Sequence, residues 1–72
     1  MDRRIGFIAR EIDSLTKALQ AAQFLLDQWK QNEERGNSPA IPTPSIGTMK
    51  SYVRGMRRNV DSIDEILDST GD

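Results

Sequence analysis

Apolar residues recur at alternating spacings of three and four along two long stretches of this chain. The first series consists of Ile5, Ile8, Ile12, Leu15, Leu19, Ala22, Leu26 and Trp29. The second consists of Ile46, Met49, Val53, Met56, Val60, Ile63 and Leu67. An α-helix has about 3.6 residues per turn, so this spacing places one apolar stripe along each helix, and each stripe needs another to cover it. The pattern predicts an all-α fold of two helices that pack along these stripes.

Glycine and proline mark the break between the two predicted helices. The first helix is expected over about residues 3–35, because Gly36 and Asn37 readily adopt the left-handed conformation that ends helices. Three prolines follow within residues 38–44, and proline interrupts a helix. A stiff, extended connector is therefore predicted over about residues 36–44.

The second helix is expected over about residues 45–69, with Thr43 or Ser45 as its N-cap. The two apolar stripes have similar lengths, which favours an antiparallel helical hairpin and a single domain over residues 1–72. Trp29 lies at the connector end of the first stripe, and we expect its ring to pack against Ile46 and against either Ile41 or Pro42.

The order of charged residues also favours the antiparallel arrangement. The chain has 10 basic and 11 acidic residues, for a net charge of -1. Arg3 and Arg4 begin the first helix, and Asp64 and Asp68 end the second, so both ends oppose the helix macrodipole. Antiparallel helices bring the basic start beside the acidic end, and we expect this attraction to offset the unfavourable placement.

The small size of the chain predicts self-association. At 72 residues, a single core rarely supplies more than about 3–5 kcal/mol of stability. Small folds are often reinforced by disulfides, a structural metal or oligomerisation, and this chain has no cysteine and no histidine. A homodimeric four-helix bundle is therefore expected, with no metal and no cofactor.

A second uncharged surface extends beyond the predicted stripes. We name the stripe positions a and d of a heptad; on the second helix the neighbouring g positions are also uncharged. Such an arc is wider than one partner helix covers. Phe24 lies further round, at an f position, where an aromatic side chain is unusual. The expected surface for self-association or for a partner comprises Phe7, Ala21, Phe24, Leu25, Tyr52 and Ile66.

Two charged clusters on the second helix are candidate binding patches. Lys50, Arg54, Arg57 and Arg58 are the residues that would contact nucleic acid. The chain has no net positive charge and no recognised nucleic-acid-binding motif, so nucleic acid is not the favoured partner. Carboxylates at outward heptad positions favour a solvated face over a metal site, and they form an electrostatic patch for a partner: Asp61, Asp64, Glu65 and Asp68.

Catalytic and membrane functions are not expected. The chain lacks the histidine or cysteine of the usual nucleophile–base pairs and has no phosphate-binding glycine loop, so we expect no enzyme activity. No apolar stretch approaches the roughly 20 residues of a membrane span, which favours a cytoplasmic protein without membrane contact.

The layout of two heptad helices in about 70 residues resembles the Rop family of plasmid copy-control, RNA-binding hairpins, and also small secretion chaperones. The connector is longer than the tight turn of Rop, and Trp29-Lys30-Gln31 lacks the Trp-x-Gly motif of WXG100 hairpins. No family is recognised from these residues. We expect a small bacterial or phage protein–protein interaction module: a regulator, an inhibitor or a chaperone. The alternatives are a Rop-like nucleic-acid binder and a structural subunit of a larger assembly.

Overall fold

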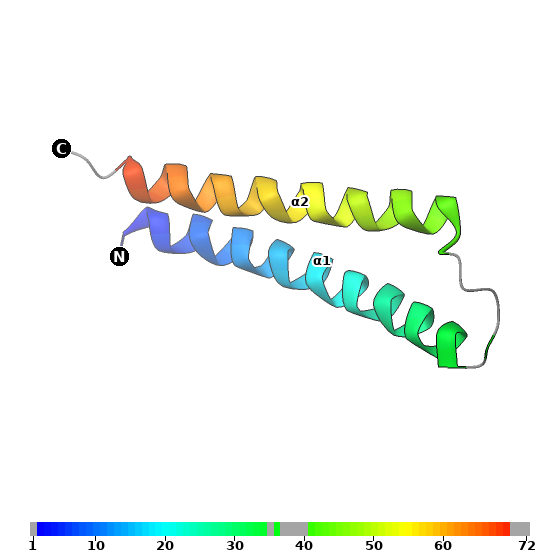
Figure 1. Ribbon diagram of the computed structural model, residues 1–72. Coiled ribbons are helices and arrows are strands. Elements are labelled where there is room, and N and C mark those ends of the chain that lie inside the picture. Colours follow the sequence, from blue (N-terminus) through cyan, green and yellow to red (C-terminus); the bar gives the residue numbers. More distant parts are fainter. Residues whose placement is uncertain (1, 35, 37–40, 70–72) are drawn as a thin grey trace.

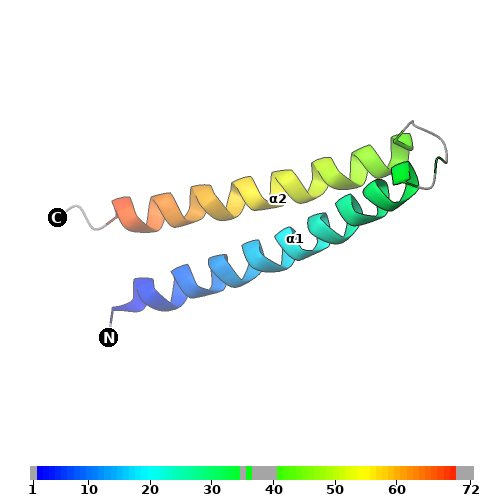
Figure 2. The ribbon, with the colours of Figure 1, turned by 60° about the horizontal axis from the view of Figure 1, so that its bottom comes forward.

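The fold, seen in a computed structural model, is an antiparallel pair of helices. The structure describes residues 2–34, 36 and 41–69. Helix α1 (Arg3–Glu34) and helix α2 (Thr43–Asp68) pack side by side, with the start of α1 beside the end of α2 (Figures 1 and 2). No strand occurs among the described residues. The predicted all-α hairpin is therefore confirmed.

Both ends of α1 are fixed by local hydrogen bonds. The backbone N–H of Arg4 donates to Oδ1 of Asp2 at 3.0 Å, and the N–H of Ile5 donates to the Asp2 carbonyl oxygen at 3.1 Å. Asp2 is thus the N-cap of α1. After the helix, Gly36 has a φ of 71° and its N–H donates to the Glu33 carbonyl oxygen at 3.1 Å. The predicted stop at Gly36 is confirmed; residues 37–40 of the expected connector lie outside the described residues.

Helix α2 begins earlier than expected and is capped by backbone alone. Pro42 is the N-cap, with an extended conformation (φ -60°, ψ 136°) and no side-chain hydrogen bond. Its carbonyl oxygen accepts the N–H groups of Ser45 at 2.9 Å and Ile46 at 3.1 Å. The assignment of Thr43 or Ser45 as N-cap is therefore wrong. Pro44 has no N–H, so the first turn has fewer unpaired donors for a side chain to satisfy.

The two helices meet along the d and g positions rather than along a and d. On α1 the buried and half-buried residues at these positions are Arg4, Ile8, Glu11, Leu15, Ala18, Ala22, Leu25 and Trp29. On α2 they are Ser45, Met49, Tyr52, Met56, Asn59, Ile63 and Ile66. Most a residues are exposed instead, with exposed fractions of 39% to 58%: Ile5, Ile12, Leu19, Ile46, Val60 and Leu67. The prediction that a positions line the seam within the hairpin is wrong for these six, because each helix is turned by about half of a 100° residue step.

Among the described residues, two side-chain hydrogen bonds cross the seam, one between a d and a g residue and one between two g residues. Nε1 of Trp29 donates to Oγ of Ser45 at 2.7 Å, and Nδ2 of Asn59 donates to Oε2 of Glu11 at 2.8 Å. The ion pairs of the described residues do not cross it: Arg4 pairs with Asp2, and Lys17 with Asp13 at 3.2 Å. Within that part of the chain, the expected attraction between basic start and acidic end forms no ion pair between the helices.

The hairpin has almost no core of its own. Ala22 is the single buried hydrophobic residue in the described part of the chain, and no side chain there is fully buried. The molecule measures 57 × 19 × 13 Å and exposes 5857 Å². A compact protein of this mass exposes about 4,500 Å². The isolated hairpin therefore leaves an unusually large surface in water.

Candidate interaction surfaces

Eight aliphatic residues at the a positions form a row on one side of the hairpin. Position a lies next to d, on the side away from g. In an antiparallel pair, equivalent positions of the two helices fall on the same side of the seam. Both sets of a residues therefore belong to one face, which we call the aliphatic row: Ile5, Ile12, Leu19, Leu26, Ile46, Val53, Val60 and Leu67.

The half-buried seam contains more polar residues than the exposed aliphatic row beside it. The g positions, which are half-buried between the helices, include Arg4, Glu11, Ser45 and Asn59. The aliphatic row has no polar member, yet six of its residues are exposed. Burial of apolar area contributes roughly 25 cal/mol per Å², so an isolated hairpin would gain by turning the aliphatic row inward. This exposure makes the row a candidate contact surface.

A groove lies at the connector end of the same face. Its volume is about 520 Å³, and its apolar lining comes from Trp29, Ile41, Ile46, Met49 and Val53. Lys50, Arg54 and Arg57 also line the groove. Because Lys50 and Arg57 are e residues and Arg54 is a b residue, these charges follow the outer edge of α2. The groove thus combines an apolar wall with a basic edge.

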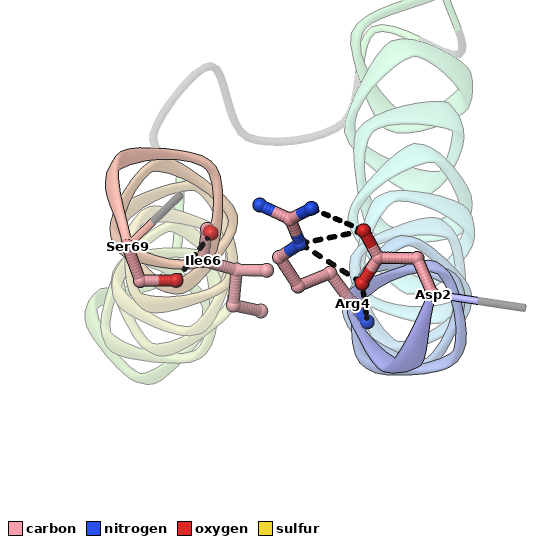
Figure 3. A network of polar contacts seen from close by, with 4 residues as sticks. All are labelled: Asp2, Arg4, Ile66 and Ser69. Carbon is pink, nitrogen blue, oxygen red and sulfur yellow. Dashed lines mark hydrogen bonds and ion pairs between the residues drawn. The ribbon is translucent and has the colours of Figure 1, made fainter. Parts of the chain in front are cut away.

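The predicted second contact surface is divided between two places in the structure. Leu25, Tyr52 and Ile66 are half-buried g residues at the seam. Figure 3 shows Ile66 pointing from α2 toward α1, across from Arg4. Phe7 and Phe24 are exposed at 51% and 66%, on the side of α1 away from the aliphatic row, and Ala21 is half-buried.

The two aromatic side chains on α1 do not form one patch. Phe7 and Phe24 are separated by seventeen residues, or roughly 25 Å along the helix at 1.5 Å per residue. Their role in self-association or in partner binding stays a prediction.

The eight predicted charged residues of α2 are all exposed. The four basic side chains come first along the helix and the four acidic ones follow: Lys50, Arg54, Arg57, Arg58, Asp61, Asp64, Glu65 and Asp68. None of them forms an ion pair within the described part of the chain. No three acidic side chains among residues 2–34, 36 and 41–69 are placed to hold a metal ion. The charges of α2 are therefore available to another molecule.

The charged pair at the start of α1 has a local, structural role. The Arg4 guanidinium and the Arg4 backbone N–H both donate to the Asp2 carboxylate (Figure 3). These hydrogen bonds lower the pKa of Asp2 from 3.8 to about 2, and the same pairing raises the pKa of Arg4. The Asp2 carboxylate and the Arg4 guanidinium are thus engaged with each other at the start of the helix.

Within the described chain, neither helix combines the length and the apolar character needed to cross a membrane. Comparisons of the chain with protein-family models, with curated proteins and with solved structures find no match. The function must therefore be inferred from the surfaces of the hairpin itself.

Proposed function

We propose that this chain is a non-enzymatic protein–protein interaction module of the cytoplasm. In this proposal two copies form a four-helix bundle, and the bundle binds a larger protein as a regulator, inhibitor or chaperone. The exposed aliphatic row carries the proposal. A helix in such a bundle turns a and d toward the bundle axis and a flanking position toward its neighbour. Half of a bundle, taken alone, would have half-buried d and g residues and exposed a residues, as this hairpin has.

The exposed area is sufficient for a stable dimer. The hairpin exposes 5857 Å², about 1,400 Å² more than a compact protein of its mass. A standard protein interface buries about 800 Å² on each partner. A second hairpin on the aliphatic row would thus bring the chain close to the exposure of an ordinary globular protein.

In this proposal the larger partner binds the outer side of α1. Phe24 is the most exposed of the large hydrophobic residues in the described chain, at 66%. It lies on the side of α1 away from the aliphatic row, so a dimer formed through that row leaves it in water. An aromatic residue at such a position supports contact with another protein.

Sedimentation equilibrium tests the dimer, and affinity capture tests the partner. The 8.1 kDa chain should sediment with twice its mass at micromolar concentration. Phe24→Asp should leave that mass unchanged and abolish recovery of the larger protein. Gln31→Asp, an exposed f residue on the same helix, is the matched control and should keep it. A folded monomer overturns the dimer, and equal recovery with Phe24→Asp overturns the assigned partner surface.

A second candidate function is nucleic-acid binding. It is favoured by Lys50, Arg54, Arg57 and Arg58, which are exposed and form no ion pair with the described residues. Phosphate-driven binding weakens steeply with salt, so a gel shift with RNA and DNA over a salt series is the test. No shift at low ionic strength removes this candidate. A third candidate is a structural subunit of a larger assembly. Its particle mass would increase beyond that of the dimer as the protein concentration is raised.

A further inference from the structure

The charges at one edge of α2 are separated by sign. This edge, made of e and b positions, lies beside the aliphatic row. Its first part carries Lys50, Arg54 and Arg57, which we call the basic half. Its second part carries Asp61, Asp64 and Asp68, which we call the acidic half.

The two halves have mirrored spacing. The basic residues are separated by four and then three positions, and the acidic residues by three and then four. Read from opposite ends of α2, the two sets therefore coincide. Two copies of α2 that run antiparallel would match each basic side chain with an acidic one.

We propose that the aliphatic row packs against the aliphatic row of a second copy, with α2 antiparallel to α2 of that copy. The basic half of each α2 then faces the acidic half of the other. The pairs are Lys50 with Asp68, Arg54 with Asp64 and Arg57 with Asp61, each formed twice about the twofold axis. This inference rests on the homodimer proposed above and adds its orientation and its contacts.

The groove at the connector end supports this orientation. Its lining combines the apolar Trp29, Ile46 and Val53 with the three residues of the basic half. The end of α2 has the complementary character, because Leu67 of the aliphatic row is flanked there by Asp64 and Asp68. The antiparallel arrangement brings this end of one copy to the groove of the other.

The opposite orientation is less complementary. With both connectors at the same end, α2 would lie beside α1 of the second copy. The e and b positions of α1 carry the acidic Asp13 and Asp27 toward the basic half, but the acidic half would lie beside the uncharged Gly6 and Ala9. Charge pairing at an interface fixes orientation and partner choice more than it adds affinity, so this difference selects the antiparallel dimer.

Charge reversal tests the pairing. One variant carries Lys50→Glu, Arg54→Glu and Arg57→Glu, and a second carries Asp61→Lys, Asp64→Lys and Asp68→Lys. Each alone should dimerise at least about tenfold more weakly than the parent chain, because attraction becomes repulsion at six pairs. An equimolar mixture should form a heterodimer with about the affinity of the parent.

A third variant controls for net charge. Arg3→Glu, Arg10→Glu and Lys17→Glu give the same net charge as the first variant, but on the f positions of α1, away from the aliphatic row. This control should keep the parent affinity, measured by sedimentation equilibrium, while circular dichroism verifies that every variant remains helical. Equal weakening of the control and the first variant overturns the proposed pairing.

Single cysteines locate the twofold axis, since the chain has no native cysteine. Val60 lies beside the point where the basic and acidic halves meet, so Val60→Cys should form a disulfide with its own counterpart on mild oxidation. Phe7 has the same exposed fraction, 51%, but lies on the other side of the hairpin. Ile46 belongs to the aliphatic row but would be about 40 Å from its counterpart.

Val60→Cys should run as a covalent dimer on a denaturing gel, and Phe7→Cys and Ile46→Cys as monomers. A dimeric parent whose Val60→Cys variant stays monomeric on the gel overturns this orientation alone. A monomeric parent overturns the homodimer and this inference together.

Discussion

Asp2 determines how α1 begins, and its protonation should therefore determine whether the first turn is formed. The hydrogen bonds from Arg4 lower the pKa of Asp2 from 3.8 to about 2. A carboxylate with a lowered pKa stabilises the fold fully above its usual pKa and loses this effect as the pH falls through the lowered value. We expect residues 3–6 to keep helical Cα chemical shifts at pH 4 and to lose them progressively toward pH 2.

Two substitutions of Asp2 separate the effect of its hydrogen-bonding oxygen from the effect of its negative charge. Asp2→Asn keeps an oxygen that accepts the Arg4 N–H, so the first turn should persist with a much smaller pH dependence. Asp2→Ala removes the acceptor, and the first turn should fray at every pH. Helical shifts at residues 3–6 in Asp2→Ala would show that the cap is not needed.

The hydrogen bond between Asn59 and Glu11 should stabilise the register of the two helices. Its donor and acceptor are 2.8 Å apart and partly buried. Removing one partner leaves the other without its hydrogen bond, so Asn59→Ala should lower the free energy of unfolding by about 1 kcal/mol. Urea titration at fixed protein concentration measures this, and a double-mutant cycle with Glu11→Ala isolates the coupling. The exposed pair of Lys17 and Asp13 should give a coupling of about 0.5 kcal/mol or less.

The surroundings of Trp29 could be predicted from the sequence in part. Its place at the connector end of an apolar stripe predicts packing against Ile46 and against either Ile41 or Pro42, and the structure places Trp29, Ile41 and Ile46 around one groove. Its hydrogen bond to Ser45 was not predicted. From the sequence, Ser45 is one of two candidates for the N-cap of α2, and nothing in the sequence indicates that the backbone of Pro42 caps the helix instead.

At the scale of the helices, the two exposed glycines Gly36 and Gly47 should respond oppositely to alanine. Gly36 has a φ of 71°, which costs an L-residue about 1–2 kcal/mol, so Gly36→Ala should destabilise the hairpin by about 1 kcal/mol. Gly47 lies inside α2, and a Cβ there would meet nothing within 4 Å. Gly47→Ala should therefore stabilise the protein by roughly 0.5–1 kcal/mol. Thermal unfolding of both variants measures the effects, and equal signs would contradict this account.

The heptad spacing was sufficient to predict both helices and their antiparallel pairing, but not the face by which they meet. A stripe of a and d residues points toward the axis of a bundle, whereas the neighbouring helix of the hairpin lies to one side of that axis. The sequence contained a signal of this difference in the uncharged g positions of α2, Tyr52, Asn59 and Ile66. From the sequence alone these positions predict a second surface, whereas the structure places them at the seam.

At the scale of the whole molecule, folding and association should be linked. Ala22 is the one buried hydrophobic residue of the described chain, and six residues of the aliphatic row are exposed in the single hairpin. If the folded hairpin is stabilised by a second copy, its melting temperature rises with protein concentration. We expect this rise between micromolar and millimolar concentrations, measured by circular dichroism; a melting temperature independent of concentration would contradict it.

Leu19 distinguishes an exposed row from a covered one. In the single hairpin its side chain is 56% exposed, and a substitution at such a surface position usually changes stability by less than about 0.5 kcal/mol. In the proposed dimer Leu19 is enclosed between two hairpins, where loss of a leucine side chain alone costs at least about 2 kcal/mol and a buried carboxylate adds to that.

Leu19→Asp should therefore abolish both the dimer and the dependence of the melting temperature on concentration. Ser14→Asp, at an exposed c position on the other side of α1, introduces the same carboxylate and should change neither quantity. Equal behaviour of the two variants would mean that the aliphatic row faces water in solution as well.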